Sequence, residues 1–221
     1  MIQTLIYAYD PLKLDLHLRS RDLFFIGPDT PITVICSPNS LADFEEIRKI
    51  AESHKNVNAV QYRNDNILKY VNPNIELIQF MCDDVIWTQP FAAFDFVQKF
   101  NDKEILYISP RLSLERLGIE VNKVNYRTLK HSITTHGDIW RTEDYIKFMN
   151  HEERDLNDPG LATNRYHVMF DNNSYLVVNK YTIPNTKELL EEGKRIDGKP
   201  WLFFPSDTEE IVQPYDYTWT V

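Results

Sequence analysis

The chain carries the stretch ELIQFMCDDVIW at Glu76–Trp87, and this stretch decides the expected fold. A run of strand-forming residues, Leu77–Met81, is followed after one cysteine by the adjacent carboxylates Asp83 and Asp84. Near-continuous apolar runs are typical of strands buried in α/β sheets, and such sheets bind ligands at the carboxyl ends of their strands. Neighbouring carboxylates repel each other, so a divalent cation that also holds phosphate oxygens is the simplest partner for them.

Strand and helix signals alternate over the first hundred residues. The pattern predicts strands at 3–9, 32–36, 57–62, 77–81 and 105–109, and helical segments at 12–24, 41–54, 67–71 and 91–100. Ser40 is expected to cap the helix 41–54, and Pro90 to open the helix 91–100 as its first residue. The alternation predicts a single α/β domain with a mostly parallel central sheet and helices on both of its faces.

The pattern loosens after residue 110. We expect a strand or extended loop at 131–140, a helix starting over 141–149 with Thr142 as its cap, and a hairpin of 166–170 with 175–181. A charged helix is predicted at 186–195. We divide the domain into two halves, 1–110 and 111–221.

Composition excludes several classes of protein. The chain has 221 residues, 43% of them hydrophobic, which is enough for a sizeable core. Cys36 and Cys82 form no CxxC pair, and this favours a reducing compartment over a disulfide framework. The net charge of −9 argues against non-specific nucleic-acid binding through a general basic field. Neither a signal peptide nor an apolar run of membrane-spanning length is recognised, so we expect a soluble, cytoplasmic protein.

Four segments together resemble the GT-A class of nucleotide-sugar glycosyltransferases, in the form of a small soluble bacterial or viral member. They are Tyr7–Asp10, Tyr62–Asn66, Phe80–Ile86 and Gly137–Asp144, and they follow the order found in the family. The Gly-rich phosphate fingerprints of dinucleotide enzymes and P-loop ATPases are absent from the sequence. The resemblance implies a GT-A-like (Rossmann-like) fold, with a nucleotide-sugar-binding half at 1–110 and an acceptor-binding half with a C-terminal packing segment at 111–221.

The acid pair is similar to the DxD motif of that class, with Cys82 in place of the first acid. The resemblance implies that Asp84, with Asp83, binds Mn²⁺ or Mg²⁺, and that Asp83 lies nearer the sugar or ribose of the donor. Such an ion needs hard oxygen ligands and offsets charge on the departing diphosphate. The alternative is a strand-end acid pair that caps the next helix or meets an arginine.

The resemblance also implies contacts to the nucleotide. Residues expected to bind it are Tyr7, Tyr9, Asp10 and Asp65, by stacking or by lying near the nucleoside. Arg141 suits the diphosphate, although it could equally pair with a neighbouring carboxylate.

Glu143 and Asp144 follow a tryptophan at a predicted helix start, where the resemblance implies the catalytic base. One carboxylate would take the proton of the acceptor hydroxyl, and the other would orient the acceptor. Acids in a first turn also simply complement the helix dipole. A late histidine, His136, His151 or His167, could be a third metal ligand.

The predicted reaction is transfer of a sugar from a nucleoside diphosphate sugar to an acceptor hydroxyl, on a glycan or on a hydroxylated base in viral DNA. With Glu143 as base, the displacement inverts the anomeric carbon. Two other functions are left open. One is a nucleotidyltransferase of related fold, which should carry a Gly-rich and basic loop after the first strand. The other is a non-catalytic binding protein with this fold.

Overall fold

The computed structural model describes most of the first 150 residues and shorter parts beyond them. The described ranges are 1–36, 41–62, 66–83, 85–87, 90–113, 123–125, 137–151, 160–171 and 176–178. The predicted helix 186–195 lies outside these ranges, as do Ser40, Asp65, Asp84 and His136.

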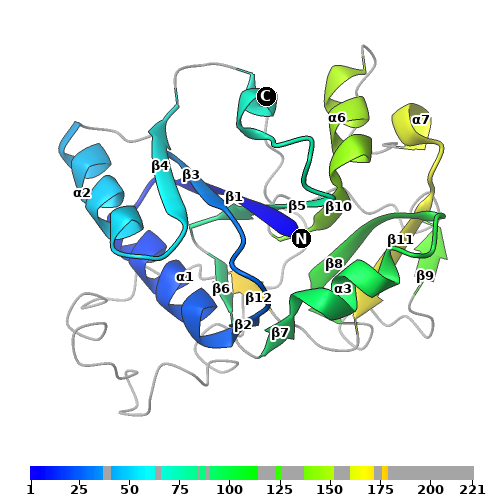
Figure 1. Ribbon diagram of the computed structural model, residues 1–221, viewed down its shortest axis with the longest axis horizontal. Coiled ribbons are helices and arrows are strands. Elements are labelled where there is room, and N and C mark those ends of the chain that lie inside the picture. The colour runs from blue at the N-terminus through cyan, green and yellow to red at the C-terminus, as the bar shows by residue number, and fades with distance from the viewer. Residues whose placement is uncertain are drawn as a thin grey trace.

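An eight-stranded mixed sheet forms the centre of the molecule (Figure 1). Its strands, in spatial order, are β4 (Val57–Gln61), β3 (Ile32–Cys36), β1 (Ile2–Ala8), β5 (Leu77–Cys82), β10 (Ile139–Arg141), β8 (Ile105–Ser113), β11 (His167–Asp171) and β9 (Lys123–Asn125). β10 and β9 run antiparallel to their neighbours, and the other strands share one direction. The predicted mostly parallel sheet is therefore confirmed.

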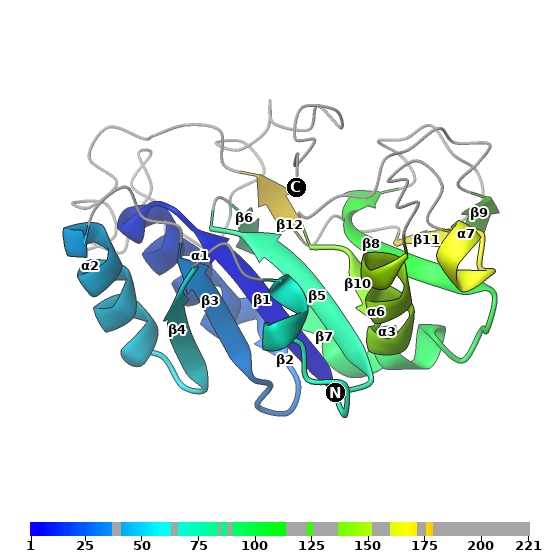
Figure 2. The same ribbon diagram turned by 90° about the horizontal axis from the view of Figure 1, so that it is seen from above.

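Helices cover both faces of this sheet (Figure 2). They are α1 (Pro11–Phe24), α2 (Leu41–Glu52), α3 (Ala93–Lys99), α6 (Thr142–Asn150), α7 (Gly160–Thr163) and the 3₁₀ helix η1 (Ile67–Tyr70). Side chains of α1, α2 and α3 share one apolar core with one face of the sheet, whereas η1 and α6 pack on the other face. This two-sided cover explains why the sequence of β5 is apolar throughout.

The first helix begins where the sequence predicts. Asp10 is its N-cap, and the Asp10 side chain accepts hydrogen bonds from the N–H groups of Leu12 and Lys13. Pro11 occupies the first turn, where its missing N–H costs nothing. The chain therefore passes from β1 to α1 through Tyr9 and Asp10 alone.

Three local predictions are wrong, the first two because strands distant in the chain pair with each other. Helix α3 begins at Ala93 and not after Pro90, because Phe91 and Ala92 form a short strand, β7, that pairs with β2 (Phe25–Ile26). The Phe91 ring packs against Trp87 and Phe96, with ring centroids 4.7 Å and 4.3 Å away.

The second wrong prediction is the hairpin. β12 (Leu176–Val178) pairs with β6 (Val85–Trp87) in a separate two-stranded sheet, because β8 and β9 take both edges of β11. The third is the cap at Thr142, which is the first residue of α6. The N-cap is Arg141, whose side chain makes no capping hydrogen bond.

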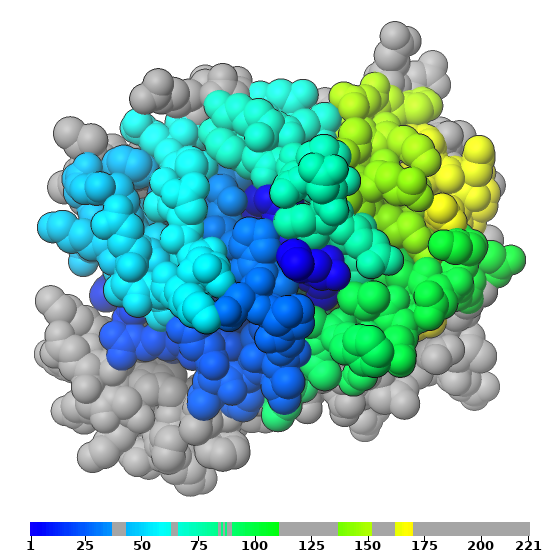
Figure 3. All heavy atoms as spheres, in the orientation of Figure 1, coloured from blue at the N-terminus to red at the C-terminus, as the bar shows by residue number. Residues whose placement is uncertain are grey.

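The sheet crosses the boundary predicted at residue 110. β8 begins before it, and β10 and β11, which flank β8, come after it. The space-filling view shows the segments on both sides of this boundary packed against each other (Figure 3). The division of roles between the halves stays a prediction. No helix in the described ranges is long and apolar enough to cross a membrane.

Candidate functional site

The switch point of the sheet lies between β1 and β5. The chain runs from β1 to β3 and β4 on one side of β1, and then returns to place β5 on the other side. Open α/β sheets bind ligands at the carboxyl ends of the strands where the order reverses in this way. Tyr9 and Asp10 follow β1 at this point, and Asp83 follows β5.

The Asp83 carboxylate joins the two strand ends. Its Oδ2 accepts hydrogen bonds from the backbone N–H groups of Tyr9 at 2.6 Å and Asp10 at 2.8 Å. The Asp83 N–H in turn donates to the carbonyl oxygen of Tyr7 at 2.9 Å. The residue is only 5% exposed. Asp83 therefore shapes the turn after β1, in addition to any role toward a ligand.

Asp10 lies next to this contact and serves the first helix. Its Oδ1 accepts from the N–H of Leu12 at 2.9 Å and from that of Lys13 at 3.3 Å. The structure thus brings Asp10 and Asp83 together, as predicted for residues of one site. Both carboxylates accept backbone hydrogen bonds, which the sequence did not indicate for Asp83.

Tyrosine side chains lie close together at the carboxyl ends of these strands. Burial raises the pKa of Tyr7, and the nearby Tyr62 and Tyr9 raise it further. Burial also raises the pKa of Tyr9 to about 12, with Cys82 and Asp83 adding to the effect. Tyr7 and Tyr9 therefore stay neutral at physiological pH. Each offers a flat ring and a hydroxyl group beside Asp83, and we call the turn at Asp83, between β5 and β6, the acid turn.

Arg141, Glu143 and Asp144 lie toward the amino ends of the parallel strands, away from Asp83. β10 runs antiparallel to β5, so Arg141 pairs with Leu77 at the start of β5, and the Thr142 N–H donates to Glu76. Asp83 lies six residues after Leu77 along the chain, a span of about 20 Å at roughly 3.3 Å per residue. The structure does not bring Arg141, Glu143 and Asp144 together with Asp83.

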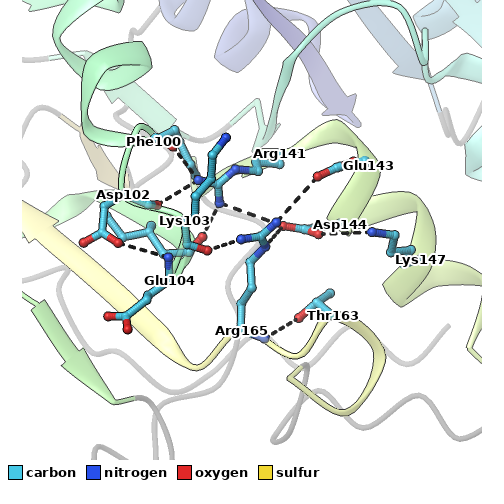
Figure 4. A network of polar contacts seen from close by, with 11 residues as sticks. Phe100, Asp102, Lys103, Glu104, Arg141, Glu143, Asp144, Lys147, Thr163 and Arg165 are labelled. Carbon is cyan, nitrogen blue, oxygen red and sulfur yellow. Dashed lines mark hydrogen bonds and ion pairs between the residues drawn. The ribbon is translucent and has the colours of Figure 1, made fainter.

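The guanidinium of Arg141 binds backbone carbonyls near the end of α3 (Figure 4). It donates to the carbonyl oxygens of Phe100, Asp102 and Ile105, the bond to Asp102 being 2.8 Å long. Burial lowers the pKa of Arg141, and Arg165 lowers it further. This set of acceptors accounts for the arginine without a diphosphate.

Asp144 is fully buried and lies among basic side chains (Figure 4). Its Oδ2 is 2.7 Å from Nε of Arg165 and 3.9 Å from a guanidinium nitrogen of Arg141. Burial raises the pKa of Asp144, and the neighbouring cations oppose that shift. The Glu143 side chain is 63% exposed and lies 3.6 Å from Arg165. No sequence signal pointed to Arg165, which lies between α7 and β11.

The described histidines form no metal centre. His167, at the amino end of β11, lies 3.5 Å from Glu104, and the His151 N–H donates to Phe148 at the end of α6. Within the described ranges, no group of three or more His, Cys, Asp or Glu residues could hold a metal ion.

Comparison with known proteins gives a structural likeness only. No family model matches the sequence, and no curated protein matches it. Among solved structures, the chain is similar to the mannosyltransferase PcManGT from Pyrobaculum calidifontis, solved with GDP-Man and Mn²⁺, at a TM-score of 0.56 and 12% identity over 83% of this chain. A second similar structure is S. aureus TarS in complex with UDP, at a TM-score of 0.46 and 14% identity over 77% of this chain.

The chain spans 57% of the length of the first of these proteins and 60% of the second. A likeness at this level of identity concerns the arrangement of strands and helices. Together with the order and direction of its strands, the likeness to PcManGT shows that this chain has the fold of the GT-A glycosyltransferases.

Proposed function

We propose that the chain is a glycosyltransferase that takes a sugar from a nucleoside diphosphate sugar, with the donor bound at the carboxyl ends of β1 and β5. One observation carries this proposal: the acid turn lies at the switch point of a GT-A sheet, where Asp83 joins the ends of the two strands. Fold alone does not imply function, so the support for this activity comes from the side chains at the carboxyl ends of these strands.

A divalent cation fits the acid turn. Mg²⁺ and Mn²⁺ are bound through one or two carboxylates, with phosphate oxygens and water completing the shell. Asp84 and Asp83 would hold the ion, and Asp84 would be the main ligand because Asp83 Oδ2 already accepts two backbone hydrogen bonds. When bound, the ion would offset the charge that develops on the leaving diphosphate.

The phenol groups beside the acid turn suit a nucleoside. The rings of Tyr7, Tyr9 and Tyr62 offer flat apolar faces to a base, and the neutral hydroxyls of Tyr7 and Tyr9 suit hydrogen bonds to a base or ribose. Asp10 lies within the same group of residues, while the contact predicted for Asp65 stays a prediction. A comparison of nucleoside diphosphates with different bases in a thermal-shift panel measures the preference for one base.

Activation of the acceptor by Glu143 or Asp144, and with it inversion at the anomeric carbon, stays a prediction. The burial of Asp144 and its ion pair with Arg165 support a structural role for that carboxylate. The contacts of Arg141 with three carbonyls likewise support a structural role over diphosphate binding. The acceptor, a glycan or a hydroxylated DNA base, also stays a prediction.

A thermal-shift panel of nucleoside diphosphates and their sugars, with and without Mn²⁺, tests the proposal. A ligand at a hundred times its Kd should add about 2.7 kcal/mol of stability. We expect one nucleotide family to raise the Tm in a metal-dependent way, and Asp84→Ala to abolish the shift. The matched control is Glu46→Ala, which removes one carboxylate from an exposed position on α2. No shift with any nucleoside diphosphate would reject the proposal.

The two other functions predict different results. A nucleotidyltransferase needs a phosphate-binding loop after β1, but the two-residue passage through Tyr9 and Asp10 provides none. A non-catalytic binding protein is favoured by one observation, the engagement of Asp83 by backbone amides. Release of nucleoside diphosphate from the identified donor sugar, lost in Asp84→Ala, would exclude this second possibility.

A further inference from the structure

Helix α1 is attached to the acid turn on both sides. Upstream, Asp83 Oδ2 accepts from the N–H of Asp10, and the Asp10 side chain caps α1. Downstream, the ring nitrogen Nδ1 of His17 lies 2.6 Å from the carbonyl oxygen of Val85, the residue that follows the acid pair. Because a carbonyl can only accept, His17 donates this hydrogen bond from Nδ1–H.

Ser20 adds a second attachment, one turn further along α1. Its Oγ accepts from the N–H of Trp87 at 3.1 Å and donates to the carbonyl oxygen of His17 at 2.8 Å. Residues three apart on a helix lie on the same face, so His17 and Ser20 bind β6 together. The strand after the acid turn is thus held by two side chains of one helix.

If position 17 served only to fill the core, an apolar residue would cost less free energy there than a histidine. The side chain is fully buried, and its Nε2 has no hydrogen-bond partner in the part of the chain that the structure describes. A buried polar atom without a partner costs free energy that an apolar side chain of similar size would not. Burial also lowers the pKa of His17 to about 4, which keeps the ring neutral as a donor to Val85.

We propose that His17, with Ser20, is a positioning residue for the acid pair: the contacts of Asp10, His17, Ser20 and Asp83 form an α1 clasp that fixes the backbone on both sides of Asp84. The inference rests on the proposed function, since the acid pair is taken to bind metal and diphosphate. A site with one or two protein carboxylates depends on their orientation, and groups that orient metal ligands typically change metal affinity by about 10–100-fold when removed.

Two substitutions separate positioning from packing. His17→Leu keeps an apolar side chain in the core but removes the donor to Val85. His17→Asn places an amide N–H₂ near the position of Nδ1 and restores a donor. The matched control is Leu14→Ala, which removes apolar volume from the same buried face of α1 but leaves the hydrogen bonds of His17 and Ser20 to β6 in place.

The Kd for the Mn²⁺–nucleoside diphosphate pair found in the wild-type panel is measured in each variant. We expect His17→Leu to raise the Kd about tenfold or more, and His17→Asn to recover most of the loss. Leu14→Ala should lower the Tm and leave the Kd unchanged. If His17→Leu lowers the Tm but binds like the wild type, His17 belongs only to the core and the proposal is overturned.

Amide exchange of residues 82–87 in the same variants, without ligand, separates failure of the clasp from failure of the proposed function. Faster exchange in His17→Leu, recovered in His17→Asn and absent in Leu14→Ala, would support the clasp even if the wild type binds no nucleotide. Unchanged exchange in His17→Leu would overturn it. A wild type without any nucleotide binding would reject only the proposed function.

Discussion

Nε of Arg165 lies 2.7 Å from Oδ2 of Asp144, which is fully buried at the amino end of the sheet. The pair joins α6 to the segment before β11, and Arg141 connects the same carboxylate to the end of α3. A buried charge without its partner is strongly unfavourable, so this ion pair is an obligate part of the packing. The carboxylate that the family resemblance nominated for catalysis therefore has a structural explanation.

Asp144 and Glu143 should differ sharply when each is replaced by alanine. Asp144→Ala leaves Arg165 without its buried partner and should lower the unfolding free energy by about 3 kcal/mol. Glu143→Ala removes an exposed side chain and should lower it by well under 1 kcal/mol. Urea denaturation measures both. Equal stabilities with a selective loss of sugar transfer in either variant would restore the catalytic interpretation.

Asp83→Ala should lose both stability and ligand binding. Removal of the carboxylate leaves the N–H groups of Tyr9 and Asp10 without their acceptor, at a cost of about 2–4 kcal/mol. Asp84→Ala should lose ligand binding alone. Denaturant titrations beside the ligand panel compare the two variants, and a fully stable Asp83→Ala protein would show that the turn after β1 does not depend on this carboxylate.

Asp10→Ala should lower the unfolding free energy by about 1 kcal/mol through loss of the helix cap, and Asp10→Ser should retain most of it. The pair also tests the predicted nucleoside contact. If Asp10→Ser folds like the wild type but binds the nucleotide more weakly, the carboxylate contacts the ligand as well as the helix. Equal affinity would assign Asp10 to the cap alone.

Protonation of His17 should destabilise the protein in acid. Burial lowers its folded-state pKa to about 4 from the usual 6.5, so the unfolded chain binds the proton more readily between these values. Stability from this residue is complete above about pH 6.5 and declines progressively toward pH 4, by up to about 3 kcal/mol. His17→Asn should lack this component.

The measurement is the difference in unfolding free energy between wild type and His17→Asn from pH 4 to pH 8. Carboxylates titrate in both proteins, so their contribution cancels in the difference. We expect the unfolding free energy of the wild type to fall relative to that of His17→Asn as the pH falls below 6.5. A constant difference across this range would mean that His17 is not buried as a neutral ring.

The order of elements in the first hundred residues was predictable because local signals and long-range packing agree there. The apolar run 77–81 forms a strand in any buried sheet, and Asp10 with Pro11 ends the first strand ahead of the helix predicted at 12–24. The cap that Asp10 provides was not predicted. The position of Asp83 at a strand end, beside the end of β1, follows from the same alternation.

The location of Arg141, Glu143 and Asp144 could not be predicted in this way, because the direction of a strand depends on the partners with which it pairs, and these are distant in the chain. Gly137, with φ 106°, leads into β10, which lies between β5 and β8. Because β10 runs antiparallel to β5, Arg141 and Asp144 lie toward the amino ends of the parallel strands. β12 pairs with β6 for a similar reason, because β11 has no edge left. The sequence by itself determined the buried strand 77–81 and the carboxylate at its end, because apolar patterning is a property of neighbouring residues. Only the tertiary structure decided which carboxylates lie at the same ends of the strands, because that depends on the direction and register of strand pairing.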